Sequence, residues 1–171
     1  MESDARNWLE REDEAARPGR QERLHWIVEH YPAAEGFFLS GGWLAKQLLE
    51  EAKYCFVYGQ YVAAAILGVA FVERVLASQF YGAGRDDLER AGGRDLLQEA
   101  LRCGWLAQPD FDRFDRMRRL RNPLVHFRAP LVRDTIEFRA VSGNTDPEHI
   151  VEGDAREVLE GVLRVLEKVA V

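Results

Sequence analysis

The sequence predicts an all-α protein, folded as an antiparallel bundle of about five helices. Apolar residues recur at intervals of three or four through most of the chain, which is the pattern of one buried face on an amphipathic helix. The chain has 171 residues, of which 47% are hydrophobic and 30% charged, so it can bury one sizeable core. Glycines and prolines fall between the apolar stretches, and short connections of this kind favour neighbouring helices that pack antiparallel.

The sequence predicts two parts: a charged helical extension at residues 1–35 and a helical bundle domain at residues 36–171. The extension mixes acidic and basic residues and has one apolar patch around Trp26, which predicts a single short helix closed by Tyr31-Pro32. It contains no apolar stretch of the kind that forms the centre of a signal peptide.

Two strong helical patterns follow. Leu44 to Phe56 predicts an amphipathic helix, and Gln60 to Tyr81 predicts the most buried helix of the bundle, with Gly59 between them. So short a connection favours a helical hairpin. The longest apolar run, Tyr61 to Val72, has twelve residues, whereas a helix that crosses a bilayer needs about 20. We therefore expect a core helix and no membrane contact.

A weaker helix is expected between Arg85 and Leu106. The next helix carries Phe111, Phe114, Met117 and Leu120 at intervals of three, and Asp110 or a neighbour is expected to cap it. Pro123 lacks a backbone donor and is expected to kink or restart this helix.

The region near 131–150 is the least determined part of the bundle. Thr135 to Val141 alternates apolar and polar residues, so a short β-hairpin and a plain loop both remain open as interpretations. Asp154 is expected to cap a final helix, whose apolar face carries Val158, Leu159, Val162, Leu163, Leu166 and Val169.

Cysteine usage and net charge limit the function classes. Cys55 and Cys103 belong to no ligand-spaced pair and are expected to be buried free thiols, which favours a reducing, cytoplasmic compartment. The histidines have no metal-ligand spacing either, so no metal site or cofactor is expected. A net charge of −6 argues against nucleic-acid binding over the whole surface, so any RNA contact has to be local.

One local exception to this acidity lies between Arg113 and Arg128. That segment has six arginines and one aspartate, an excess of five positive charges that can attract a polyanion. The alternative is a solvated helix face whose arginines form salt bridges. The six arginines are Arg113, Arg116, Arg118, Arg119, Arg121 and Arg128.

His126 lies within this basic segment, where a histidine is suited to proton transfer at a phosphate. On a straight helix, however, residues five apart diverge by about 140°. Arg121 and His126 therefore share one face only if Pro123 bends the chain between them.

The run Arg121-Asn122-Pro123-Leu124-Val125-His126 resembles the R-x4-6-H motif of HEPN domains. The preceding hairpin is also similar to the one that these domains place before the motif, and the resemblance covers roughly Leu44 to Phe127. The segments that carry it are Glu51 to Tyr54, Tyr58 to Ala64 and Phe71 to Leu76.

This resemblance implies a metal-independent endoribonuclease in which two copies face each other across a homodimer cleft. His126 would act as general base or acid at the ribose 2'-hydroxyl or the leaving oxygen, and Arg121 would hold the scissile phosphate. Asn122 would orient the substrate or the histidine. Cleavage by internal transesterification spares DNA, which lacks the 2'-hydroxyl. Such proteins act as toxins or in antiviral defence, commonly beside a neutralising antitoxin.

Further residues belong to this hypothesis. Glu73 ends the apolar run of its helix and is expected to support the active centre, the alternative being simple emergence into solvent. Arg119 also has a spacing that the motif tolerates, but Asn122 directly follows Arg121 and favours the latter. The remaining arginines, Arg113, Arg116, Arg118 and Arg128, are expected to bind RNA.

Two other function classes stay open on the sequence. One is a non-catalytic HEPN-like module that binds RNA, a nucleotide or a protein. The other is a helical structural domain in which Arg121 pairs with an acidic side chain.

Overall fold

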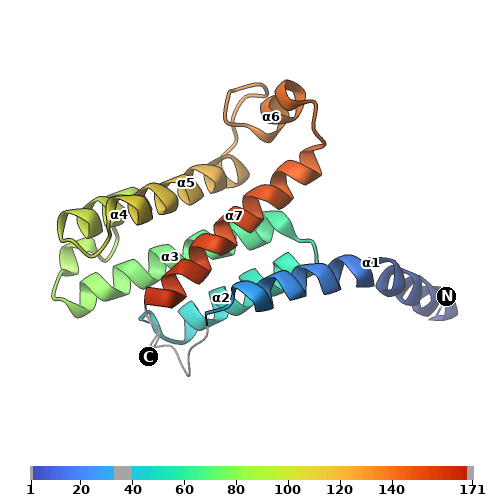
Figure 1. The fold of residues 1–171 in the computed structure, drawn as a ribbon, viewed down its shortest axis with the longest axis horizontal. Helices are drawn as coiled ribbons and strands as arrows, with labels where there is room; N and C mark the ends of the chain where they lie inside the picture. Colours follow the sequence, from blue (N-terminus) through green and yellow to red (C-terminus); the bar gives the residue numbers. More distant parts are fainter. Residues whose placement is uncertain (1, 33–39, 169–171) are drawn as a thin grey trace.

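This computed structural model describes residues 2–32 and 40–168 of the chain. The described residues form seven α-helices and one short 3-10 helix, joined by turns and loops, and they contain no strand. The predicted all-α class is confirmed, but with seven α-helices in the described residues where about five were expected (Figure 1). In chain order the elements are α1 Glu2–His30, α2 Gly42–Val57, α3 Tyr61–Gly82, η1 Asp86–Leu88, α4 Gly93–Arg102, α5 Gln108–Val125, α6 Ile136–Gly143 and α7 Pro147–Lys168.

The centre of the bundle is α3, which packs against α2, α5 and α7. Within the described residues it is the one helix long and apolar enough to cross a membrane, but half of its most apolar stretch is buried among its neighbours. That burial is typical of a core helix. The predicted hairpin of α2 and α3 is present, and the two helices lie side by side (Figure 1).

Two glycines bring α7 close to its neighbours and so fix where α5 lies. A Cβ atom added to Gly68 of α3 would lie 2.7 Å from Cγ1 of Val158, and one added to Gly161 would overlap the thioether of Met117 on α5. Helices approach this closely only where one of them lacks a side chain. The α3, α5 and α7 triplet is therefore tightly packed.

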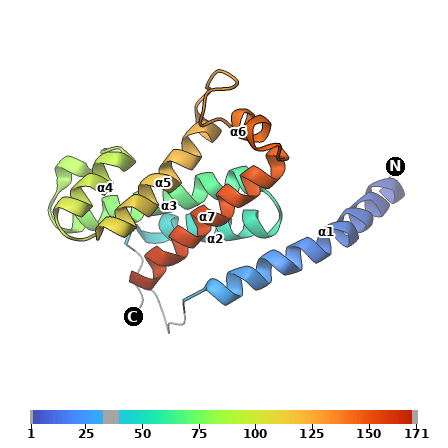
Figure 2. The ribbon, with the colours of Figure 1, turned by 45° about the horizontal axis from the view of Figure 1, so that its top comes forward.

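The helix α1 is much longer than the short helix expected from the sequence. Only its last part packs on the bundle, where Ile27 is buried and Arg23 donates hydrogen bonds to the Val57 carbonyl and the Tyr61 hydroxyl. Residues 4–18 are exposed, and this half projects away from the bundle (Figure 2). The predicted domain boundary after residue 35 lies outside the described residues.

The segment after α5 forms a helix, α6, instead of the hairpin or loop that was expected. The Thr135 hydroxyl accepts a hydrogen bond from the Phe138 N–H and caps the helix, and Asn144 ends it in the left-handed conformation. The apolar and polar alternation of residues 135–141 was therefore misleading, because capping decided the local structure.

Three smaller expectations were also wrong. Asp154 does not cap the last helix, which begins at Pro147 with the Asp146 carboxylate accepting from the Glu148 N–H. Asp110 lies inside the first turn of α5, buried and paired with Lys168 at 2.8 Å. Cys103 is exposed, although Cys55 is buried as expected. Val169, expected on the face of the last helix, lies outside the described residues.

Candidate active site

The inner face of α5 carries the first residue of the predicted motif. Asp110, Phe114 and Met117 are buried, and their spacing of four and three places the next inward position at Arg121. An arginine thus occupies a position where an apolar residue would continue the core. Its side chain keeps only 19% of its exposed surface.

Arg121 is held by one carboxylate from the central helix. Its Nη2 donates to Oε1 of Glu73 at 2.7 Å, across the contact between α5 and α3. A guanidinium carries five N–H donors, and no second protein acceptor for Arg121 is found within the described ranges. The remaining donors are thus free for a ligand.

Glu73 itself lies against the start of α4. A Cβ atom added to Gly93, the first residue of that helix, would lie 2.8 Å from Cδ of Glu73 and overlap the carboxylate. Glu73 thus does not simply emerge into solvent but pairs with Arg121, as the alternative of a structural domain with a paired Arg121 also expects.

Asn122 turns back onto its own helix. With its amide oriented so that both groups are satisfied, it donates to the Arg118 carbonyl at 3.1 Å and accepts from Arg118 Nη1 at 3.2 Å. Arg118 also pairs with Asp115 at 2.8 Å, and Arg119 pairs with the same carboxylate at 3.2 Å. These contacts hold the end of α5 together.

The six arginines of the basic segment lie on different sides of α5 and on the loop that follows it. Arg113 and Arg116 face α7, where they pair with Glu160 at 3.8 Å and with Glu157 at 3.0 Å. Arg121 faces α3, and Arg128 lies exposed on the loop after α5. Arg113 and Arg116 therefore form salt bridges, as in the alternative interpretation of this basic segment.

His126 lies exposed at the end of α5. The helix runs through Pro123 and ends two residues later, and the His126 N–H donates to the Asn122 carbonyl at 3.0 Å from an extended backbone. Pro123 therefore does not restart the helix. Among the described residues no hydrogen bond or ion pair joins His126 to Arg121, and His126 is exposed whereas Arg121 is largely buried.

The loop around His126 is unusually apolar for an exposed segment. The fractional exposure is 93% for Phe127 and 61% for Leu131, and the latter adopts the left-handed backbone conformation. Val125 and Val132 are also exposed. This group of four, the tip patch, borders His126 in the sequence.

Sequence reasoning missed the ion pair that anchors α6 beside this loop. Both Nη atoms of Arg139 donate to the buried Asp154 of α7, at 2.6 and 2.8 Å. These hydrogen bonds raise the pKa of Arg139. A buried aspartate within an apolar helix face was a signal that a cation had to lie nearby.

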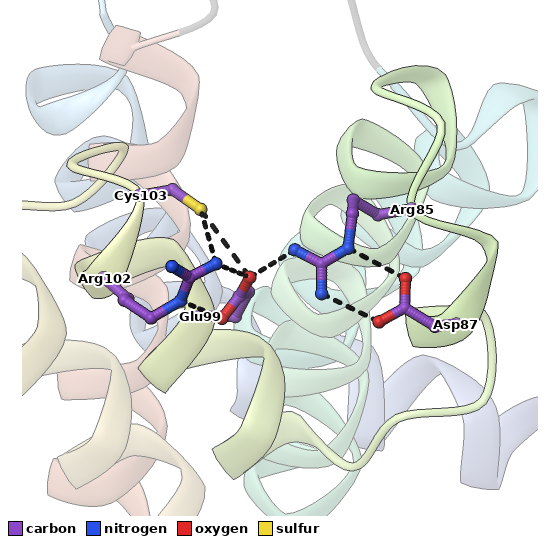
Figure 3. Close-up of polar contacts among 5 residues, drawn as sticks. All are labelled: Arg85, Asp87, Glu99, Arg102 and Cys103. Atoms are coloured by element: carbon purple, nitrogen blue, oxygen red, sulfur yellow. Dashed lines mark hydrogen bonds and ion pairs between the residues drawn. The ribbon is translucent and has the colours of Figure 1, made fainter.

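A second polar cluster lies at the other end of α4. Glu99 accepts from Arg85 and Arg102, Asp87 pairs with Arg85 at 2.7 Å, and the Cys103 thiol lies beside them (Figure 3). Hydrogen bonds from Arg102 and Arg85 lower the pKa of Glu99 to about 2. Each charged group here already has a partner.

Comparison with known proteins adds no assignment, because no protein-family model, curated protein or solved structure matches the chain. Among the described residues no cluster of three or more histidine, cysteine or acidic side chains could hold a metal ion. A cavity of about 570 Å³ between α3, α5 and α7 is lined by none of the predicted site residues.

Proposed function

We propose that this chain is a HEPN-like, metal-independent endoribonuclease that acts as a cytoplasmic toxin or defence effector. The observation that carries the proposal is Arg121, an arginine at a core position of α5 that one carboxylate holds while its other donors stay free. A fixed guanidinium with unused donors suits a scissile phosphate, because it stabilises the charge that develops on the phosphoryl oxygens.

His126 supplies the proton transfer in this proposal. It takes the proton from a ribose 2'-hydroxyl, whose oxygen then attacks the adjacent phosphorus. The bond from phosphorus to the 5'-oxygen breaks, and that oxygen takes up a proton. The products are a 2',3'-cyclic phosphate and a free 5'-hydroxyl, as the motif's resemblance implies.

A second copy of the chain completes the site. Arg121 is largely buried beside Glu73, His126 is exposed, and no hydrogen bond or ion pair joins the two within the described residues of one copy, which supports a site shared between copies. The exposed tip patch next to His126 supports a homodimer in which the histidine of one copy approaches the arginine of the other.

The direct test is cleavage of mixed RNA by the purified protein in EDTA. The wild type is expected to cut RNA but not DNA, and His126→Ala is expected to lose roughly 10²- to 10⁴-fold in rate. Arg121→Ala is expected to lose a similar amount. His149→Ala, which removes another exposed histidine, is the matched control. Cleavage that survives both substitutions, or that EDTA abolishes, contradicts the proposal.

Mixing two inactive variants tests the composite site. If Arg121 of one copy works with His126 of the other, Arg121→Ala and His126→Ala copies form heterodimers with one intact site, and cleavage returns in part. Phe127→Asp is expected to separate the copies and to abolish cleavage, with the mass measured by light scattering. A fully active monomer would refute the dimeric arrangement.

A non-catalytic module is the second candidate, and the paired arginines favour it. Five of the six arginines between Arg113 and Arg128 already have carboxylate partners, which leaves little free positive charge for a long RNA and favours a smaller ligand, such as a nucleotide, or a protein. A wild type that binds RNA or a nucleotide without cutting, with binding weakened by Arg121→Ala, supports this candidate.

A further inference from the structure

Glu73 is confined by two helices besides its own. Arg121 of α5 lies 2.7 Å from its Oε1, and a Cβ atom added to Gly93 of α4 would overlap that same oxygen. A Cβ atom at position 93 would approach Cγ of Glu73 to 3.0 Å and Cδ to 2.8 Å. Both distances are shorter than ordinary contacts, so any side chain at position 93 displaces the carboxylate.

The backbone gives no other reason for a glycine at position 93. Its φ does not lie in the left-handed region, unlike that of Gly41 or Gly104. An alanine in the first turn of a helix normally stabilises the fold, because glycine loses more conformational entropy. The space taken by Glu73 is therefore what the glycine provides.

The start of α4 also attracts the carboxylate. The first N–H groups of a helix have no partner inside it, and the helix dipole places partial positive charge there. Gly92, the residue before the helix, offers no side chain to cap it. Glu73 thus lies between a guanidinium and the positive end of a helix.

We infer that Gly93 is a positioning residue for Arg121, acting through Glu73. The inference rests on the proposed function, since the arginine so positioned is the one that binds the scissile phosphate. The missing side chain at Gly93 leaves the space in which the Glu73 carboxylate lies while it accepts one hydrogen bond from Arg121. The other donors of Arg121 make no hydrogen bond to a protein acceptor within the described residues.

The test substitutes Gly93→Ala and compares it with Gly153→Ala. Gly153 is an exposed glycine inside α7 whose added Cβ meets nothing within 4 Å. Because a carboxylate at the end of a flexible side chain can shift without unfolding the protein, Gly93→Ala is expected to fold. Its turnover of RNA is expected to fall roughly 10- to 100-fold, as for a small misplacement of a catalytic group, while RNA binding stays near that of the wild type.

Rescue distinguishes positioning from a simple packing defect. Glu73→Asp shortens the acidic side chain by one methylene and makes room for the new methyl group. Gly93→Ala is therefore expected to cost much less turnover in the Glu73→Asp background than in the wild type. In the Arg121→Ala background it is expected to cost nothing more. A Gly93→Ala loss that stays the same in both backgrounds overturns the inference.

An NMR readout keeps this test separate from that of the proposed function. The side-chain Nε–H signal of Arg121, identified by its loss in Arg121→Lys, is expected to shift in Gly93→Ala and to stay in place in Gly153→Ala. An unmoved signal overturns the inference whether or not the protein cuts RNA. A wild type that does not cut RNA refutes the proposed function, while a shifted signal still establishes the link from Gly93 to Arg121.

Discussion

One ion-pair cluster lies at each end of α4, around Glu99 and around Glu73. The two clusters differ in the number of hydrogen bonds that their arginines make to carboxylates. At the C-terminal end, Glu99 has two arginines, and Arg85 uses three nitrogens on Asp87 and Glu99 (Figure 3). At the N-terminal end, Glu73 has one arginine, which it holds by a single N–H group. Both clusters connect helices, but Arg85 makes three hydrogen bonds to carboxylates, whereas Arg121 makes one.

This difference separates a structural ion-pair network from a candidate site. A guanidinium such as that of Arg85, which three hydrogen bonds to two carboxylates hold, stabilises its surroundings and offers a ligand fewer donors. A guanidinium fixed by one bond is already oriented, and a phosphate can use the rest of it without breaking that bond. Four predictions test the comparison, from the largest expected effect to the smallest.

Removing Glu73 should cost the most stability. Glu73→Ala leaves the Arg121 guanidinium half-buried and unpaired, so the free energy of unfolding is expected to fall by about 1–3 kcal/mol in urea denaturation. The double variant Glu73→Leu with Arg121→Met should recover most of that loss, because apolar side chains of similar size replace the pair. It should also be unable to cut RNA. If Glu73→Ala is as stable as the wild type, the pair behaves as an ordinary surface ion pair.

Glu99 should make stability depend on acid pH. Its pKa in the folded protein is about 2, against an ordinary value of 4.5, so the unfolded chain takes up the proton first as the pH falls. Its contribution is complete above about pH 5 and is lost as the pH falls toward 2. Melting curves of Glu99→Gln should lack this part of the pH dependence. Glu10→Gln, on the exposed part of α1, is the charge-matched control and should keep it.

Removing Arg102 should have a smaller effect. Its side chain is 68% exposed, and Glu99 keeps Arg85 as a partner when Arg102 is gone. The melting temperature of Arg102→Ala is expected to fall less than that of Arg85→Ala. Equal losses in melting temperature would show that Glu99 needs both Arg85 and Arg102, and that neither arginine can replace the other.

The two cysteines should give the smallest effect on stability and a clear difference in reactivity. Cys103→Ser is expected to leave the melting temperature unchanged, because the thiol is exposed and its contacts are weak. Burial raises the pKa of the Cys55 thiol, so a thiol reagent should label Cys103 quickly in the native protein and Cys55 only on unfolding. Two fast thiols would mean that the α2 face of the bundle opens readily.

The main helices could be predicted because each carries its own apolar period. The inward direction of Arg121 was also available in the sequence, since it continues the spacing of Phe114 and Met117 along α5. The missing contact between Arg121 and His126 follows from the same helical geometry. Pro123 does not remove that obstacle, because a proline so near a helix end costs one hydrogen bond and leaves the helix intact.

The differences from expectation at Asp154, Arg113 and Arg116 share one physical cause, which is that partners distant in the sequence decided the outcome, whereas local capping decided the structure of α6. From the sequence alone Asp154 was expected to cap a helix, but in the structure it pairs with Arg139. Arg113 and Arg116 were expected to bind RNA, but they pair with carboxylates of α7. The role of Gly93 depends on a side chain twenty positions earlier. Periodicity within one helix contains no information about such pairs.

The projecting helix α1 affects how the size of the protein in solution must be measured. At 1.5 Å per residue, its 29 residues span about 44 Å, and much of that length stands clear of the bundle (Figure 2). The frictional coefficient of a particle increases with its elongation. A single copy should therefore elute from a gel-filtration column at the volume expected for a compact protein of larger mass. Elution volume alone would then suggest a dimer when none is present, and a mass measured by scattered light is the appropriate evidence.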